Sequence, residues 1–249
     1  MGALGIEGSY VAVRIDPGEL PSVVDKIRAG ELDGVNVTMP HKRAAADLVD
    51  ELTPDARESH SVNTIVREED GRLTGHSTDI SALRRLWNAK PMPNGRPVLV
   101  LGAGGAAAAA CLAAPVAVVY VSARRPEAVA SLAGDLERAV VGIPWRAAVA
   151  DAVIINATAL GMEGEELPDR VVRLASGLVD MAYGQIDKAY GAPTTPAIAT
   201  AQKLGIPTVD GLELLVAQAG DSFRLWTGHE PPWEAMVAAA RNHSRPPGG

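Results

Sequence analysis

The chain has 249 residues, of which 47% are hydrophobic and 21% are charged, a composition typical of a folded globular protein rather than a disordered one. Its net charge of −7 argues against a surface that binds nucleic acid or an anionic membrane. No apolar run is long enough to cross a bilayer and the N-terminus has no leader pattern, so we expect a cytoplasmic protein.

The cysteine and histidine content argues against disulfides and metal sites. Cys111 is the only cysteine, so it cannot form an internal disulfide and is expected to be a small buried packing residue. The five histidines show neither His-x-x-x-His spacing nor a cluster with cysteine, the arrangements that a zinc site requires. The sequence therefore predicts no metal.

The first 90 residues alternate between strand and helix patterns around a reactive loop. Residues 11–15 predict a strand, residues 20–27 an amphipathic helix, and a second strand then leads into Asn36-Val37-Thr38-Met39-Pro40-His41-Lys42. Pro40 should end that strand and Lys42 should open the next helix, which places an amide, a hydroxyl and an amine beside a cleft. For Pro-x-Lys alone, the alternative is a lysine on a solvated first helical turn.

Residues 90–97 contain three prolines and a glycine and predict a domain linker. Beyond them strand patterns (98–101, 116–121, 152–156, 177–181) alternate with helix patterns (106–112, 126–136, 171–175). This alternation predicts an α/β fold with a doubly wound, Rossmann-like parallel sheet over residues 96–209. Residues 1–90 would form a discontinuous α/β substrate domain onto which helices of residues 210–243 pack back. The polar tail, residues 244–249, is expected to be disordered.

A glycine-rich loop, Gly102-Ala103-Gly104-Gly105-Ala106-Ala107, follows the first strand of the predicted parallel sheet and opens a helix. Gly102 permits a tight turn, and Gly104 lets the backbone approach a pyrophosphate. The helix N-terminus then presents unpaired N–H groups to the phosphates. In this context the loop predicts dinucleotide binding, and the alternative is a purely structural turn.

The end of the next predicted strand indicates which dinucleotide. Where an NAD-binding site usually has an acidic residue, this chain has Arg124 and Arg125 and no carboxylate. A guanidinium can bind a ribose 2′-phosphate with two hydrogen bonds, whereas a carboxylate would repel it. We therefore predict NADP rather than NAD, the alternative being two solvated arginines at a helix start.

Six segments in chain order resemble the shikimate dehydrogenase family. The loop 36–42 is similar to the family's hallmark loop. The other segments that carry the resemblance are Ser61-Val62-Asn63-Thr64, Gly75-His76-Ser77-Thr78-Asp79, Ile155-Asn156-Ala157-Thr158-Ala159-Leu160-Gly161-Met162, Asp180-Met181-Ala182-Tyr183, and the stretch from Asp210 to Gly228.

The resemblance implies an NADP-dependent interconversion of 3-dehydroshikimate and shikimate, or of a closely related cyclic hydroxy acid, in aromatic amino acid biosynthesis. It implies that Lys42 and Asp79 are the catalytic pair, with the proton transferred by either of them. The substrate-binding residues would be Thr38, Asn63, Tyr183 and Gln218. The cofactor-binding residues would be Gly102, Gly104, Gly105, Ala106, Arg124, Arg125, Thr158, Met181 and Gly211. Because Thr78-Asp79 precedes an apolar periodic run, Asp79 is also a candidate helix N-cap, and capping and catalysis do not exclude each other.

The chain departs from the family pattern at its start. Residues 4–10 align beyond the family's Ser-x-Ser motif, whose hydroxyls hold the substrate carboxylate, so we expect a strand, a helix and this clamp to be missing. Ser59-His60-Ser61 also fits the Ser-x-Ser pattern, but it lies just before Val62-Asn63-Thr64 and is not the missing motif. The alternative function is therefore a catalytically silent or substrate-shifted paralogue, with a quinate- or aminoshikimate-type substrate or no turnover. The expected partner is a small cyclic hydroxy acid, and an uncovered sheet edge predicts a homodimer.

Overall fold

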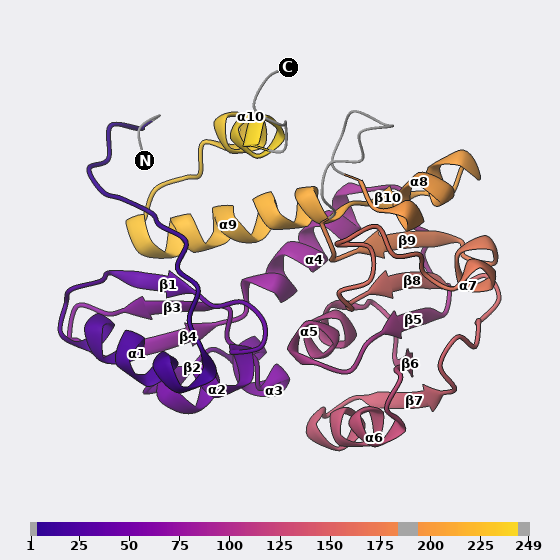
Figure 1. Ribbon diagram of the computed structural model, residues 1–249, viewed down its shortest axis with the longest axis horizontal. Helices are drawn as coiled ribbons and strands as arrows, with labels where there is room; N and C mark the ends of the chain where they lie inside the picture. The colour runs from indigo at the N-terminus through magenta and orange to yellow at the C-terminus, as the bar shows by residue number, and fades with distance from the viewer. Residues whose placement is uncertain (1–3, 184–193, 244–249) are drawn as a thin grey trace.

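Two β-sheets of different design lie at the centres of two lobes (Figure 1). The computed structural model describes residues 4–183 and 194–243. The expected disordered tail, residues 244–249, lies outside the described residues. One sheet is small and mixed and is built from the first part of the chain, whereas the other is parallel and is built from the middle part.

The mixed sheet has the strand order β1-β3-β4-β2, formed by β1 (Gly34–Asn36), β2 (Glu51–Leu52), β3 (Thr64–Arg67) and β4 (Leu73–His76). The short 3-10 helix η2 (Pro17–Glu19), α1 (Leu20–Arg28), α2 (Lys42–Leu48) and α3 (Pro54–Ser59) belong to the same lobe. Leu20, Val24 and Ile27 of α1 recur at helical spacing and are buried against Ile65 and Leu73 of the sheet. The predicted helix over 20–27 is confirmed, and α2 begins at Lys42 as predicted.

The strand predicted over residues 11–15 is wrong. These residues have no regular secondary structure, and Val11 and Val13 are 73% and 72% exposed. An alternation of β-branched residues indicates only a local preference for extended backbone. A strand also needs a neighbouring strand whose backbone groups hydrogen-bond with its own. Among the described strands β3 is the one ladder neighbour of β1, so this segment adds no strand to the sheet.

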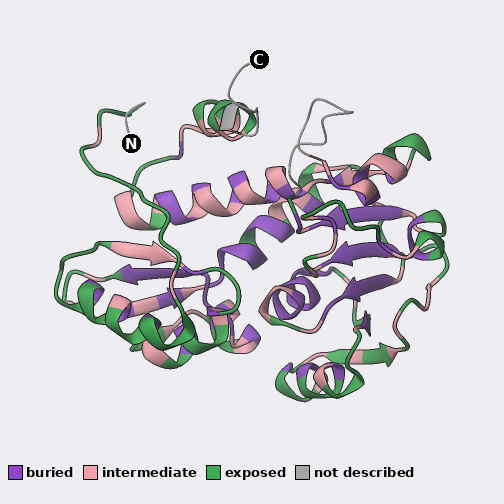
Figure 2. Ribbon diagram, in the orientation of Figure 1, coloured by how far each residue is buried: buried purple, intermediate pink, exposed green. Residues whose placement is uncertain are grey.

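The parallel sheet has the order β10-β9-β8-β5-β6-β7, with every neighbouring pair parallel. The strands are β5 (Val98–Leu101), β6 (Val118–Ser122), β7 (Ala139–Ile143), β8 (Val153–Asn156), β9 (Gly177–Asp180) and β10 (Thr208–Val209). All residues of β5, β8 and β9 are buried, as expected for central strands covered on both faces (Figure 2). The predicted doubly wound α/β sheet is confirmed, with β7 and β10 as additional edge strands.

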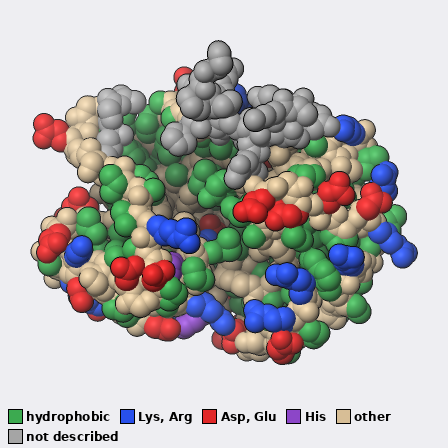
Figure 3. Space-filling view, viewed as in Figure 1, with side chains coloured by type: hydrophobic (Ala, Val, Ile, Leu, Met, Phe, Trp, Pro, Cys, Tyr) green, Lys and Arg blue, Asp and Glu red, His purple; other side chains and the backbone are tan. Residues whose placement is uncertain are grey.

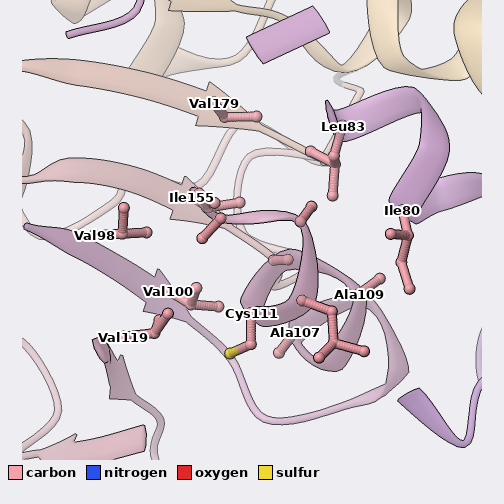
Figure 4. Close-up of a cluster of buried hydrophobic side chains, with 14 of the residues drawn as sticks. Ile80, Leu83, Val98, Val100, Ala107, Ala109, Cys111, Val119, Ile155 and Val179 are labelled. Carbon is pink, nitrogen blue, oxygen red and sulfur yellow. The ribbon is translucent and has the colours of Figure 1, made fainter. Parts of the chain in front are cut away.

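Helices cover both faces of the parallel sheet. One face packs against α4 (Thr78–Ala89), α5 (Gly105–Ala113), α6 (Pro126–Asp135) and α9 (Gly211–Thr227), the other against α7 (Asp169–Arg173) and α8 (Pro196–Lys203). Figure 4 shows strand residues such as Val100 and Ile155 facing Ala107 and Cys111 of α5. Cys111 is fully buried, as predicted, and burial raises the pKa of its thiol to about 12.

The long helix α9 contacts both lobes. Its N-terminus is closed by a capping box in which Asp210 accepts from the Glu213 backbone and Glu213 accepts from the Asp210 backbone. Leu214 packs into the core of the parallel sheet, whereas Trp226 Nε1 donates to the backbone oxygen of Ile65 in the mixed sheet at 3.0 Å. The final helix, α10 (Trp233–His243), lies across α9 (Figure 1).

The surface is mixed in charge. On the face drawn in Figure 3, basic and acidic side chains are scattered over both lobes and do not gather into one large patch of a single sign. None of the helices within residues 4–183 and 194–243 is long and apolar enough to cross a membrane.

Candidate active site

The parallel sheet creates a crevice at one point of its edge. From β5 the chain moves outward through β6 and β7 and then returns to β8 on the other side of β5, so the order reverses between β5 and β8. The loops that follow these two strands diverge there, and ligands of open α/β sheets bind outside the carboxyl ends of the strands at such a switch point. These loops carry Gly102, Gly104 and Gly105 after β5, and Thr158 after β8.

A cavity of about 540 Å³ lies beside this crevice and is lined by residues of both lobes and of α9. It gathers most of the residues predicted for the site. Those that line it are Thr38, Lys42, Asn63, Asp79, Ala106, Thr158, Met181, Tyr183, Gly211 and Gln218. Gly102, Gly104, Gly105, Arg124 and Arg125 are not part of its lining.

Lys42 and Asp79 form an ion pair at the cavity wall. Lys42 Nζ donates to Asp79 Oδ2 at 2.5 Å, and the two side chains are only 16% and 9% exposed. Lys42 is the first residue of α2, whereas Asp79 lies in the first turn of α4. The N-cap of α4 is Ser77, and Asp79 makes no capping hydrogen bond, so the N-cap alternative for Asp79 is wrong. Its carboxylate faces the amine instead.

Asn63 holds this ion pair in place. Its Oδ1 accepts from the Thr78 backbone at 2.7 Å, which points its Nδ2 toward Thr78 Oγ1 at 2.9 Å and Asp79 Oδ1 at 3.1 Å. Gln218 Oε1 of α9 lies 3.4 Å from the same Nδ2. Each Asp79 oxygen therefore has its own donor, Lys42 or Asn63, and the carboxylate is fixed from both sides.

The glycine loop has the shape that a dinucleotide requires. Gly102 has φ of +112°, and a Cβ there would lie 2.8 Å from the Ala157 backbone oxygen, so the turn tolerates no side chain. Gly104, the N-cap of α5, faces open space, with no atom within 4 Å of a Cβ position. This bare helix N-terminus leaves room for a phosphate against backbone N–H groups. The residues present thus fit a pyrophosphate.

The same loop abuts the helix that carries Lys42. A Cβ on Gly105 would lie 2.6 Å from Ser61 Oγ and 3.5 Å from Lys42 Cβ. The close approach joins the predicted cofactor loop to the lysine without an intervening side chain. A cofactor seated on this loop would therefore lie next to the ion pair.

Arg124 and Arg125 lie at the same sheet edge as the glycine loop. Ser122 at the end of β6 pairs with Leu101 at the end of β5, and the Gly102 backbone N–H donates to Ser122 O at 2.9 Å. The two arginines follow directly, with Arg125 as the N-cap of α6, and both are exposed. Both arginines lie close to the glycine loop in the fold and are exposed to solvent. Their guanidinium groups are therefore accessible to a phosphate at the outer end of a dinucleotide.

A buried polar network underlies the other side of the cavity. Asp180 at the end of β9 accepts from Asn156 Nδ2 at 2.8 Å, from the Ala182 backbone at 3.0 Å and from Thr195 Oγ1 at 2.5 Å. Asn156 also accepts from Thr158 Oγ1 at 2.6 Å. The network fixes the loops that carry Thr158, Met181 and Tyr183, and its anchoring role for Asp180 was not predicted from sequence.

Ionisation of Asp180 should oppose folding at neutral pH. Burial raises the pKa of Asp180 from its ordinary value of 3.8 to about 6, although its three hydrogen bonds lower it. The folded state thus holds this proton more tightly than the unfolded state, so the contribution to stability is full below pH about 4 and is lost as pH rises through about 6. Relative to Asp180→Asn, the free energy of unfolding should be about 1.4 kcal/mol higher at pH 5 than at pH 7.5. Urea denaturation of both proteins at the two pH values measures it, and a pH-independent difference would contradict it.

Several residues of the cavity wall were not predicted as site residues. Tyr10, Met162, Phe223, Trp226 and Met236 line it, as does Asn36, which was quoted as part of the loop but not assigned a role. Met162, Phe223 and Trp226 belong to segments that resemble the family but were assigned no role. The contribution of Phe223, Trp226 and Met236 depends on how α9 and α10 pack in the fold. In the sequence, a helical run of apolar residues after Asp210 signalled burial but not which cavity it would line.

Comparisons with known proteins agree on one family. Residues 1–65 match the model of the shikimate dehydrogenase substrate binding domain, and residues 211–241 match that of the shikimate 5'-dehydrogenase C-terminal domain. The chain is 38% identical to a shikimate dehydrogenase (NADP(+)) of Anaeromyxobacter sp. over 251 residues, covering 95% of this chain and 86% of the relative. It is 39% identical to the protein of that name from Thermococcus kodakarensis, covering 96% and 87%.

A solved structure extends the likeness to three dimensions. The shikimate 5-dehydrogenase of Thermus thermophilus, in complex with NADP(H) and shikimate, has a TM-score of 0.81 and 34% sequence identity to this chain. The match covers 97% of this chain and 90% of that one.

Proposed function

The chain belongs to the shikimate dehydrogenase family, and from this we propose that it is an NADP-dependent oxidoreductase that interconverts 3-dehydroshikimate and shikimate. The observation that carries the proposal is the Lys42–Asp79 ion pair, which faces a cavity at the switch point of a parallel sheet and adjoins a glycine loop fit for a dinucleotide.

The reaction needs a hydride at the ring carbon and a proton at its oxygen. NADPH, when bound, supplies the hydride. We assign to Lys42 the hydrogen bond to the substrate oxygen, which would stabilise the negative charge that develops during hydride transfer. Asp79 holds the amine in position, and the pair takes the proton back from the hydroxyl in the opposite direction. Because Asn63 fixes Asp79, the pair is preorganised before the substrate arrives.

The remaining polar groups of the cavity supply the substrate contacts. We assign Thr38, Asn63, Tyr183 and Gln218 to the ring hydroxyls, since all of them line the cavity. Thr38 and Tyr183 are exposed and so available, whereas Asn63 and Gln218 are already joined to each other and to Thr78. We assign Met181, Gly211, Thr158 and Ala106, which also line the cavity, to its cofactor side.

If Arg124 binds the ribose 2′-phosphate, its loss should weaken the binding of NADP and leave that of NAD nearly unchanged. Arg124→Ala should raise KM for NADP about tenfold, because a charge-assisted hydrogen bond to the 2′-phosphate is lost, and should leave KM for NAD within about twofold. Steady-state kinetics with both cofactors measures the ratio. Arg173→Ala on α7, an equally exposed arginine on the other face of the sheet, is the matched control. Equal effects of Arg124→Ala on NADP and NAD would refute the 2′-phosphate contact.

The function itself is tested by following NADP reduction by absorbance, with shikimate, quinate and aminoshikimate offered in turn. Turnover of shikimate supports the proposal. Turnover of quinate or aminoshikimate instead would show a substrate-shifted enzyme, and NADP binding without turnover of any of them would show a catalytically silent paralogue.

The proposal extends to the domains and the assembly. Residues 1–90 with 210–243 would bind the substrate, and residues 96–209 would bind NADP in the cytoplasm. The edge strand β1, whose one described ladder neighbour is β3, would pair with a second copy to form a homodimer. Light scattering of the purified protein at the 25.9 kDa monomer mass would contradict the dimer.

A further inference from the structure

We propose that a second cavity, between α4, α9 and α10, binds a small aromatic carboxylate. It has a volume of about 410 Å³, and none of the residues that line it lines the cavity of the candidate active site. The inference goes beyond the proposed function, because it assigns a ligand to a part of the molecule that the proposed reaction does not use.

The second cavity lies on the side of α9 that faces away from the candidate active site. Val216 and Ala217 of α9 line the second cavity. Leu215 and Gln218 of the same helix line the first. Successive residues of an α-helix are turned by about 100° about its axis, so these two pairs lie on opposite faces. The helix α9 therefore separates the two cavities.

Trp233, the first residue of α10, gives the second cavity an aromatic wall. Its ring lies against Gly220 of α9, where a Cβ would come within 2.2 Å of the ring. The guanidinium of Arg85 in α4 lies 4.8 Å from the ring centroid. The aliphatic residues that line the same cavity are Leu86, Leu212, Val216 and Val237. An aromatic ligand would thus find an aromatic partner and aliphatic contacts in one place.

Three of the five charged residues in the wall are already occupied. Glu213 forms an ion pair with Lys90, and Arg224 donates two hydrogen bonds to Glu230. Asp210 accepts from the backbone N–H of Glu213 in the capping box of α9. The donors left for a ligand therefore come from the other two charged residues, Arg85 and Arg241.

Both of these arginines have unused N–H groups. Arg85 donates through Nη2 to Ala217 O at 2.9 Å and to Asp221 Oδ1 at 3.0 Å, whereas its Nη1 and Nε make no hydrogen bond within the described residues. The Arg241 guanidinium is exposed and has no hydrogen bond or ion pair with residues 4–183 or 194–243. The unused charge of the cavity is therefore positive.

A carboxylate fits this arrangement better than other anions. Its two oxygens match the planar donor fork of a guanidinium. The apolar part of the wall disfavours a phosphate, which carries more charge and loses more hydration on entering. The carboxylates of Asp210 and Glu213 in the same wall would also repel a dianion more strongly than a monoanion.

The test is calorimetric titration with 2-naphthoate, a planar aromatic carboxylate. Arg241→Ala should weaken its Kd about tenfold, because a charge-assisted hydrogen bond is lost. The neutral 2-naphthamide keeps the rings and lacks the charge, so it should bind the unmodified protein about tenfold more weakly than 2-naphthoate does. Arg170→Ala, on the opposite face of the parallel sheet in α7, replaces another exposed arginine and should not change the Kd.

Lys42→Ala distinguishes the two cavities. Lys42 lines the first cavity and not the second, so this variant should bind 2-naphthoate as the unmodified protein does. A Kd weakened by Lys42→Ala would place the ligand in the first cavity and overturn the inference. So would an unchanged Kd in Arg241→Ala, equal binding of 2-naphthoate and 2-naphthamide, or no binding up to about 5 mM. No turnover is measured, so the result does not depend on the proposed function.

Discussion

Replacing Lys42 with alanine is expected to lower kcat for shikimate oxidation by about a thousandfold, the range of a lost proton-transfer group. The variant loses the only cation within hydrogen-bond distance of Asp79 among the described residues, and with it the group that we propose stabilises charge on the substrate oxygen. The Kd for NADP should stay within about threefold, because we assign the pyrophosphate contacts to backbone groups of the glycine loop. Steady-state kinetics and a fluorescence titration with NADPH measure the two effects.

Two controls separate a chemical effect from a structural one. Lys26→Ala, an exposed lysine on α1, should leave kcat unchanged. The thermal midpoint of Lys42→Ala reports the cost of leaving the Asp79 carboxylate without its partner at a buried position. An unchanged kcat in a folded Lys42→Ala protein would refute the catalytic assignment.

Gly211→Ala is expected to lower kcat/KM about a hundredfold and the free energy of unfolding by about 3 kcal/mol. A Cβ at this position would lie 2.1 Å from the Ala182 backbone oxygen, 2.6 Å from its carbonyl carbon and 2.9 Å from the Tyr183 nitrogen. Backbone cannot rotate away as the end of a long side chain can, so α9 or the segment 181–183 must shift. Both line the cavity, and the shift would therefore reach Met181, Tyr183 and Gln218 together.

Gly134→Ala serves as the matched substitution, since no atom lies within 4 Å of a Cβ there and the residue is in the last turn of α6. It should leave kcat/KM unchanged and the unfolding free energy equal or slightly raised. Urea denaturation and kinetics on both variants give the comparison. A Gly211→Ala protein with the stability and activity of Gly134→Ala would show that this close contact relaxes without cost.

The central strands of the parallel sheet were predictable because burial on both faces leaves a signature in the sequence. Val98–Leu101 is a continuous apolar run between a proline-rich segment and a glycine loop, and it is fully buried. The edge strand Ala139–Ile143 is partly exposed, and Thr208–Val209 is a two-residue strand, so neither leaves such a run. Over residues 11–15 the error was the opposite one, because a strand was predicted where none forms. A local strand pattern carries no information about whether a neighbouring strand is available to pair with it.

The candidate site was predictable where a motif carried it and not elsewhere. Lys42, Asn63 and Asp79 belong to segments that resemble one family, and the structure brings them within hydrogen-bond distance of one another as a connected set. The place of Tyr10 depends on Asn36 and on Trp226, which is 216 residues further along the chain. No local pattern contains that contact, so sequence reasoning could not find it.

The shared helix α9 sets a condition on the synthesis of the protein. The wall formed by Gly211, Gln218 and Trp226 comes from about the last sixth of the chain, after the strands of both sheets have been translated. A nascent chain that has emerged only to β10 holds all the described strands and the Lys42–Asp79 partners, yet it lacks the helix that forms one wall of the cavity. We therefore expect catalytic competence to appear late in translation, and a ribosome-bound chain stalled before residue 211 to be folded in part and inactive.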